Sequence, residues 1–133
     1  MKRLFYVTAL LLFAVLSCRQ ASFDDQCRQQ AEEYTEKQCP MKISKGVVLD
    51  SMTYSKAMRC LTYHYTISGE IDDAKLVQGN INMFRKQLLS MITNSVKLKR
   101  AKDEGINFRY VYVSATSHKP LASITLRKED YSK

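Results

Sequence analysis

Residues 58–67 read Met-Arg-Cys-Leu-Thr-Tyr-His-Tyr-Thr-Ile and show the clearest alternation of side chains in the chain. Successive side chains of a β-strand point to opposite faces of the sheet. One face of this stretch is mainly polar, and the other carries Leu61, Tyr63, Tyr65 and Ile67. The pattern predicts a half-buried strand whose aromatic face lies against a core.

Three further strands are expected on either side of this stretch. Residues 47–54 are rich in β-branched and aromatic residues and precede a plausible turn at 55–57, which makes a hairpin with 58–67. Residues 106–113 alternate in the same way and place Phe108, Tyr110 and Tyr112 on one face. A loop at 116–120 and a strand at 121–127 complete a second hairpin.

Two amphipathic helices are expected, one before each hairpin. The first begins at Ser22, which opens a Ser-x-x-Asp capping pattern, and ends before Pro40 because proline disfavours helical geometry at the preceding residue. The second is capped by Asp72 or Asp73, and its apolar positions recur with helical period from Val77 onward. A short basic helical piece at 96–104 follows it.

The expected fold class is therefore α+β, in the order α-β-β-α-β-β. We expect a two-layer structure in which a mostly antiparallel four-stranded sheet carries the helices on one face. The face beneath the helices holds six large side chains: Leu61, Tyr63, Tyr65, Phe108, Tyr110 and Tyr112. A chain of this length predicts a single domain, at residues 22–133.

The first 17 residues are typical of an export signal. Lys2 and Arg3 precede an apolar stretch at 4–16, which is too short to span a hydrocarbon core of about 30 Å as a helix. Its end, Val15-Leu16-Ser17-Cys18, resembles the lipobox of bacterial lipoproteins, although Leu16 and Val15 depart from the commonest residues. The resemblance implies a signal peptide at 1–17, diacylglycerol on Cys18 and a lipidated tether at 18–21. An ordinary secretory peptide cut at the same bond and an uncleaved anchor are the alternatives.

Three short motifs of the remaining chain resemble a group of small exported proteins of gut-type bacteria that has no assigned activity. They are Cys39-Pro40-Met41, Leu49-Asp50-Ser51 and Tyr63-His64-Tyr65. The resemblance implies an exported α+β protein and no particular chemistry. We expect a location in the cell envelope, anchored to the outer membrane rather than the inner one, or otherwise periplasmic or secreted.

Four cysteines are present, and Cys18 is the candidate for lipid attachment. Cys27 and Cys39 are twelve residues apart on one expected helix, roughly 18 Å, which is too far for a disulfide. Cys39 and Cys60 are the more plausible pair in an oxidising compartment. The alternative is that all three remaining cysteines are small buried apolar residues.

Catalytic and metal-binding patterns are scarce in this sequence. The chain has two histidines, and neither His64 nor His118 lies in a zinc-ligand spacing or a nucleophile–base motif. We therefore expect no metal, no cofactor and no enzyme activity. A small hydrolase that uses His64, His118 or Cys60 is the rival hypothesis.

The charge is strongly positive, with 21 Lys and Arg against 13 Asp and Glu, and the densest basic run is Lys97, Lys99, Arg100 and Lys102. Nucleic acid is not expected as a partner, because export would remove the protein from the compartment that holds nucleic acid. A basic helix end near a lipid anchor could face anionic headgroups, or it could simply be solvated. We therefore expect a membrane-anchored envelope protein that binds another envelope protein. An inhibitor or immunity protein that neutralises a toxin or hydrolase is the alternative, and the oligomeric state is not predicted.

Overall fold

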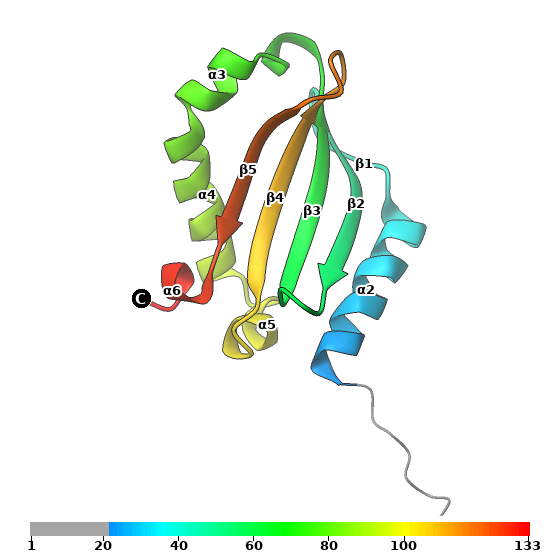
Figure 1. Ribbon diagram of the computed structural model, residues 1–133, viewed down its shortest axis with the longest axis vertical. Helices are drawn as coiled ribbons and strands as arrows, with labels where there is room; N and C mark the ends of the chain where they lie inside the picture. Colours follow the sequence, from blue (N-terminus) through cyan, green and yellow to red (C-terminus); the bar gives the residue numbers. More distant parts are fainter. Residues whose placement is uncertain (1–21) are drawn as a thin grey trace, which may run out of the picture.

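The computed structural model describes residues 22–133 (Figure 1). The expected signal peptide at 1–17 and the tether with Cys18 lie outside these residues. Five strands form one mixed sheet in the order β1-β2-β3-β4-β5. Their bounds are β1 Met41–Ser44, β2 Val47–Ser55, β3 Cys60–Ile67, β4 Asn107–Ser114 and β5 Pro120–Leu126.

Two expectations about the sheet need correction. The four expected strands are all present, but β1 adds a fifth and pairs antiparallel with the first residues of β2. In addition, β3 and β4 pair in parallel along their whole length, from Cys60 opposite Asn107 to Ile67 opposite Ser114. Parallel neighbours need a long crossover that returns the chain to the same end of the sheet. The helical segment between β3 and β4 supplies that crossover.

The helices follow the expected capping residues. Helix α2 (Phe23–Gln38) is capped by Ser22, whose Oγ accepts a hydrogen bond from the Asp25 backbone N–H. Helix α3 (Ala74–Gly79) is capped by Asp73, and helix α4 (Ile81–Asn94) continues from Asn80. The remaining helical elements are η1 (Gly69–Ile71), α5 (Lys99–Asp103) and α6 (Lys128–Tyr131).

The aromatic face of the sheet forms the core, as the alternation predicted. Phe108 and Tyr110 are buried, and the Tyr63 and Tyr110 rings stack at 4.9 Å between centroids across the parallel pair β3–β4. The helices cover this face with one buried residue of α2 and two of α4: Ala31, Leu88 and Ile92. No helix within residues 22–133 is long and apolar enough to cross a bilayer.

Side chains from the helices cap the backbone at the sheet edges. On the β5 side, Gln78 donates to the Leu121 carbonyl at 2.6 Å and Arg85 donates to the Thr125 carbonyl at 2.9 Å. Beyond the short β1, the outer edge of β2 is capped by Thr35, which bonds both the N–H and the C=O of Met52. These contacts satisfy edge groups that would otherwise be available to another strand.

Candidate functional site: an apolar groove

A groove of about 460 Å³ lies between the helical crossover and the β1 end of the sheet. Its side chains are almost all apolar: Ile43, Val47, Ile67, Ile71, Leu76, Val77, Phe84, Leu88, Met91 and Tyr112, with Ser44 and Gln87 as the polar members. The volume lies within the range of about 300–1,000 Å³ that is usual for ligand sites.

Each wall of the groove comes from a separate part of the chain. The last residue of β3, Ile67, lies opposite Val47 of β2 and contributes to the floor. Helix α4 contributes Phe84, Leu88 and Met91, which recur at helical spacing along one side. These walls meet only because the crossover brings α3 and α4 back over the end of β3.

The β1–β2 turn closes one end of the groove through Gly46. Gly46 has φ +77° and its carbonyl accepts the Ser68 N–H at 2.9 Å. A Cβ at this position would lie 2.5 Å from the Ser68 carbonyl oxygen. Glycine is therefore required both for the left-handed backbone and for the close approach of the two segments.

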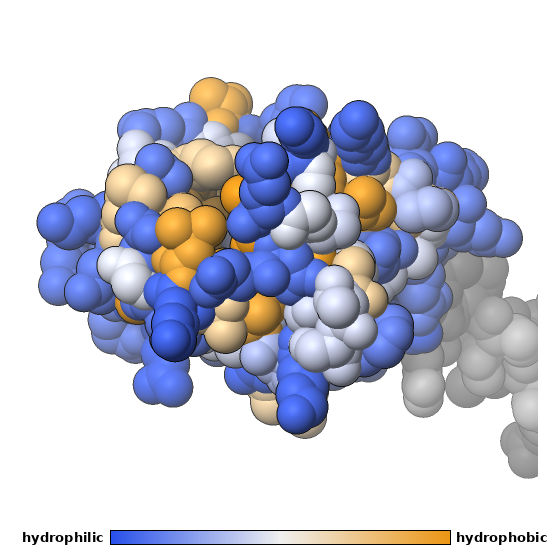
Figure 2. Space-filling view, turned by 90° about the horizontal axis from the view of Figure 1, so that it is seen from above, coloured by the Kyte–Doolittle hydropathy of each residue, from blue (hydrophilic) through white to orange (hydrophobic). Residues whose placement is uncertain are grey.

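The walls of the groove are unusually exposed for apolar side chains. Met91 is 63% exposed, Ile43 52% and Leu76 46%. Figure 2 looks from above onto the end of the molecule that carries α3 and shows apolar side chains gathered between hydrophilic ones. A cluster of exposed apolar side chains of this kind is typical of an interaction site for another macromolecule. A small molecule bound in the groove would leave the outer parts of these walls in contact with water.

The groove lacks the groups that acid–base or nucleophilic chemistry needs. Of the described residues that line it, none is a carboxylate, imidazole, thiol or amine. Tyr112 is the only titratable group in the lining, and burial raises the pKa of its hydroxyl, so it stays protonated at neutral pH. The lining therefore offers mainly apolar surface to a partner.

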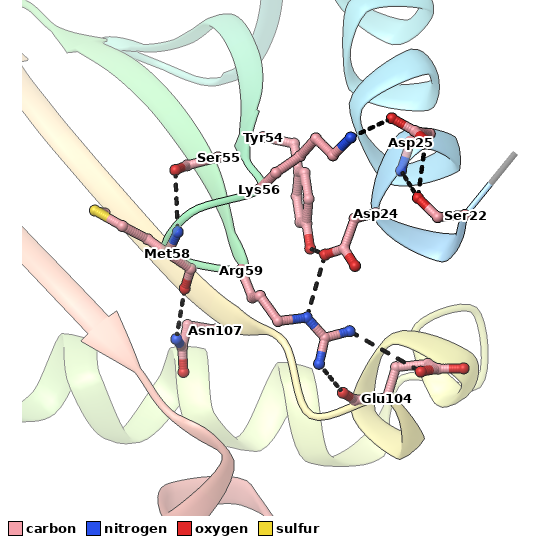
Figure 3. A network of polar contacts seen from close by, with 10 residues as sticks. All are labelled: Ser22, Asp24, Asp25, Tyr54, Ser55, Lys56, Met58, Arg59, Glu104 and Asn107. Atoms are coloured by element: carbon pink, nitrogen blue, oxygen red, sulfur yellow. Dashed lines mark hydrogen bonds and ion pairs between the residues drawn. The ribbon is translucent and has the colours of Figure 1, made fainter.

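A polar network lies at the opposite end of the sheet and fixes the start of α2 (Figure 3). Asp24 accepts a hydrogen bond from the Tyr54 hydroxyl at 2.5 Å and from Arg59 Nε at 3.2 Å. Arg59 also donates to the Glu104 carbonyl at 3.0 Å, so that α2, the β2–β3 turn and the end of α5 are joined. The hydrogen bond from Tyr54, with help from Arg59, holds the pKa of Asp24 below its ordinary value.

The expected disulfide between Cys39 and Cys60 is not formed, which corrects the sequence-based expectation. Cys27, Cys39 and Cys60 are all free thiols. Cys39 precedes β1, which pairs with the start of β2, whereas Cys60 lies opposite Ser55 at the other end of β2. Several residues at about 3.3 Å each separate these positions, far beyond the reach of a disulfide.

The three residues of the hydrolase hypothesis are not brought together. His64 Nε2 lies 2.9 Å from Thr53 Oγ1 on the polar face of the sheet, and burial lowers the pKa of its ring. His118 lies in the β4–β5 loop with φ +58°, and Cys60 is buried at the start of β3. In residues 22–133 no group of three His, Cys, Asp or Glu is placed to hold a metal ion.

The basic run lies on and before α5, beside the start of α2. Lys99 pairs with Asp103 at 2.6 Å, and Lys102 donates to the Thr93 carbonyl at 2.7 Å. Arg100 lies 5.0 Å above the Phe23 ring and donates to the Gln26 side chain. Lys97 makes no ion pair with any described residue.

Sequence reasoning identified the core but missed the groove. The available signal was the pair of apolar residues Leu76 and Met91 at the margin of the buried stripe of the crossover helices, both of which are more than one-third exposed. Without the position of β1, nothing in the sequence showed that they face another apolar wall.

The fold and the groove together define a class: a small α+β domain whose helical crossover leaves an open apolar groove over one end of a mixed sheet. The chain belongs to the family described as a domain of unknown function, DUF8479, whose model matches residues 22–122. No curated protein matches this sequence.

Three solved structures share the fold at low sequence identity. A candidate secreted protein of Pseudomonas aeruginosa has a TM-score of 0.67 and 16% identity, with 84% of this chain and 99% of that chain covered. The pilotin EpsS of the Vibrio vulnificus type 2 secretion system has a TM-score of 0.61 and 8% identity, covering 81% of this chain and 90% of that one. The type II secretion system pilotin AspS of Vibrio cholerae has a TM-score of 0.57 and 12% identity, covering 80% and 90%.

Proposed function

We propose that this protein is an exported, membrane-anchored binding protein of the bacterial envelope, and that its groove holds an amphipathic helix of another envelope protein. It acts by binding, without catalysis, metal or cofactor. The single observation that carries the proposal is the open apolar groove with exposed walls. The similarity in fold to two pilotins of type II secretion systems supports a protein partner in the envelope.

A helix is the occupant that the groove walls suit best. Phe84, Leu88 and Met91 follow the i, i+4, i+7 spacing of one α4 face, and such ridges pack against the side chains of a second helix. Met91 adds an unbranched, adaptable side chain of the kind found on peptide-binding surfaces. The exposed areas of Met91, Ile43 and Leu76 would be covered by a helix laid along the groove.

The charge near the groove indicates which kind of helix would bind. Four lysines neighbour lining residues along the chain and make no ion pair within residues 22–133: Lys42, Lys45, Lys75 and Lys86. Three carboxylates also lie near the lining: Glu70 and Asp72 flank Ile71, and Asp73 caps α3. The four lysines therefore exceed the carboxylates by one charge, and this excess favours a partner helix with acidic residues beside its apolar stripe, which would also raise the rate of association.

Photo-crosslinking in cells tests the groove. A photoreactive amino acid at position 91 or 43 should give an adduct with one apolar segment of an envelope protein. The same amino acid at Met83, which lies on α4 and is 48% exposed but does not line the groove, should not. A synthetic peptide of the crosslinked segment should then bind the purified domain, at least about tenfold more weakly after Met91→Asp but not after Met83→Asp. No adduct from positions 43 and 91, or identical adducts from all three positions, would refute the groove as the binding site.

The anchor is tested separately at Cys18. Labelling cells with an alkyne fatty acid should mark the protein, and Cys18→Ser should abolish the label. An unlabelled wild-type protein would leave ordinary secretion as the explanation of the leader.

A further inference from the structure

The structure assigns a membrane-facing corner to the segment Val96–Lys102, and we infer that it lies on anionic lipid headgroups and points the groove away from the bilayer. This inference rests on the proposed anchor at Cys18. Helix α5 packs beside the first turn of α2, where Arg100 lies 5.0 Å above the Phe23 ring. Figure 1 shows α5 and the start of α2 at the same end of the sheet.

The length of the tether limits where the membrane can be. Cys18 and Ser22 are separated by four peptide units, which span at most about 14 Å in any conformation. An acyl chain on Cys18 would therefore hold the surface of the bilayer close to the start of α2. The segment before α5 lies at this same end of the domain, since Arg100 donates to Gln26 at 3.3 Å.

The surface of this corner has the composition of an interfacial contact. Val96 is 85% exposed, the highest value among the exposed large apolar residues, and Lys97 follows it. Apolar side chains that enter the headgroup region next to lysine or arginine are typical of proteins that lie on membranes.

The net charge of the corner also fits anionic lipid. The start of α2, the β2–β3 turn and residues 96–104 hold four carboxylates, which pair with three cations: Asp24 and Glu104 with Arg59, Asp25 with Lys56, and Asp103 with Lys99. Lys97, Arg100 and Lys102 make no ion pair with a described residue, so these segments carry six positive and four negative charges, a net charge of +2. Positive side chains near an anionic surface each strengthen binding several-fold.

The corner and the far end of the groove lie at opposite ends of the sheet. The corner is near the start of β3, where Arg59 joins α2 to α5, and the far end of the groove is at Ile67, the last residue of β3. Eight residues of strand at about 3.3 Å each separate these two points, roughly 25 Å, whereas Met91 at the near end of the groove precedes Val96 by five residues. A domain resting on Val96–Lys102 would therefore turn the Ile67 end of the groove toward the aqueous side, where a partner helix can enter it.

Hydrogen exchange on the acylated protein in vesicles tests the orientation. In vesicles of phosphatidylcholine with phosphatidylglycerol, amides of 95–102 should exchange more slowly than in phosphatidylcholine alone, while the groove-end segment 69–76 should not change. Equal exchange of 95–102 in both vesicles, or slowing at 69–76 instead, would overturn the inference.

The unacylated Cys18→Ser chain provides a test that does not depend on the anchor. It should sediment with phosphatidylglycerol vesicles at low salt, and Val96→Asp with Lys97→Glu should weaken this binding about tenfold or more. The matched pair Met83→Asp with Lys75→Glu, which makes the same change of charge away from the corner, should not. If the two double variants behave alike, the corner is not a lipid contact. If Cys18 carries no acyl group but the corner variants still weaken vesicle binding, the anchor fails and the corner stands.

Discussion

Replacing Tyr54 with phenylalanine should destabilise the domain through one hydrogen bond. Tyr54 is 8% exposed and donates its hydroxyl to Asp24 Oδ1 at 2.5 Å, and the ring itself keeps its packing in Tyr54→Phe. A hydrogen bond to a charged group contributes about 1.5–3 kcal/mol. Asp24 is 26% exposed and keeps Arg59, so water and that guanidinium offset part of the loss. We expect the free energy of unfolding to fall by about 1–2 kcal/mol at pH 7.

The pH dependence of this effect tests its electrostatic origin. The pKa of Asp24 in the folded state lies below its ordinary value of 3.8, chiefly because of the Tyr54 hydrogen bond. A lowered folded pKa contributes stability above the unfolded pKa, and this stability is lost as the pH falls through the folded pKa. The gap between wild type and Tyr54→Phe should therefore be constant from neutral pH down to about pH 5 and shrink below about pH 4.

Urea unfolding followed by far-ultraviolet circular dichroism measures this gap, since the chain has no tryptophan to report it. Tyr63→Phe is the matched control, because the Tyr63 hydroxyl has no hydrogen bond within residues 22–133 and its loss should change little. Equal stability of Tyr54→Phe and wild type at pH 7 would refute the reasoning. So would a gap of the same size at pH 7 and at pH 2.5.

Three other measurements check separate features of the structure. Burial raises the pKa of Tyr65 to about 12, so tyrosinate absorbance from this residue should appear late in an alkaline titration. The free energy of unfolding should fall as the pH rises above about 10, where the unfolded tyrosine ionises first. Ionisation of Tyr65 at its ordinary pKa in the folded state would contradict the buried aromatic face. A reducing agent should leave the unfolding midpoint unchanged, because Cys27, Cys39 and Cys60 are free thiols. Cys60, which is 2% exposed, should react most slowly of the three with an alkylating reagent in the native state. A Cys39–Cys60 bridge seen by mass spectrometry would disprove the assignment of free thiols. Gly46→Ala should cost about 1–3 kcal/mol because of its positive φ and the contact with the Ser68 carbonyl, and an unchanged melting temperature would show that this turn relaxes freely.

The two aromatic strands were predictable from the sequence because their information is local. Alternation at 58–67 and 106–113 placed Tyr63 and Tyr110 on the core face, where the two rings stack. The parallel pairing of β3 with β4 was not predictable in this way, since the direction of a neighbour depends on the route of the connection rather than on either strand. β1 was missed because four residues, three of them exposed, carry too short a pattern.

The groove was beyond sequence reasoning for a related reason. It needs Ile43 of β1, Leu76 of α3 and Met91 of α4 to meet over the end of β3, and these residues are far apart in the chain. The helical period of 81–94 indicated a buried stripe but could not show that its margin would stay uncovered. Local periodicity therefore predicted the core, while the groove depends on where the crossover returns.

Capping of the sheet edges by Gln78, Arg85 and Thr35 has a consequence for copies of the protein at high local density, as the proposed anchor would produce. Copies at high density meet often, and an open β-strand would act as a template for stacking one copy onto the next. Here the carbonyls of Leu121 and Thr125 and the backbone of Met52 already have partners from the same chain. Crowded copies should therefore remain separate molecules, each with its own groove open to a partner.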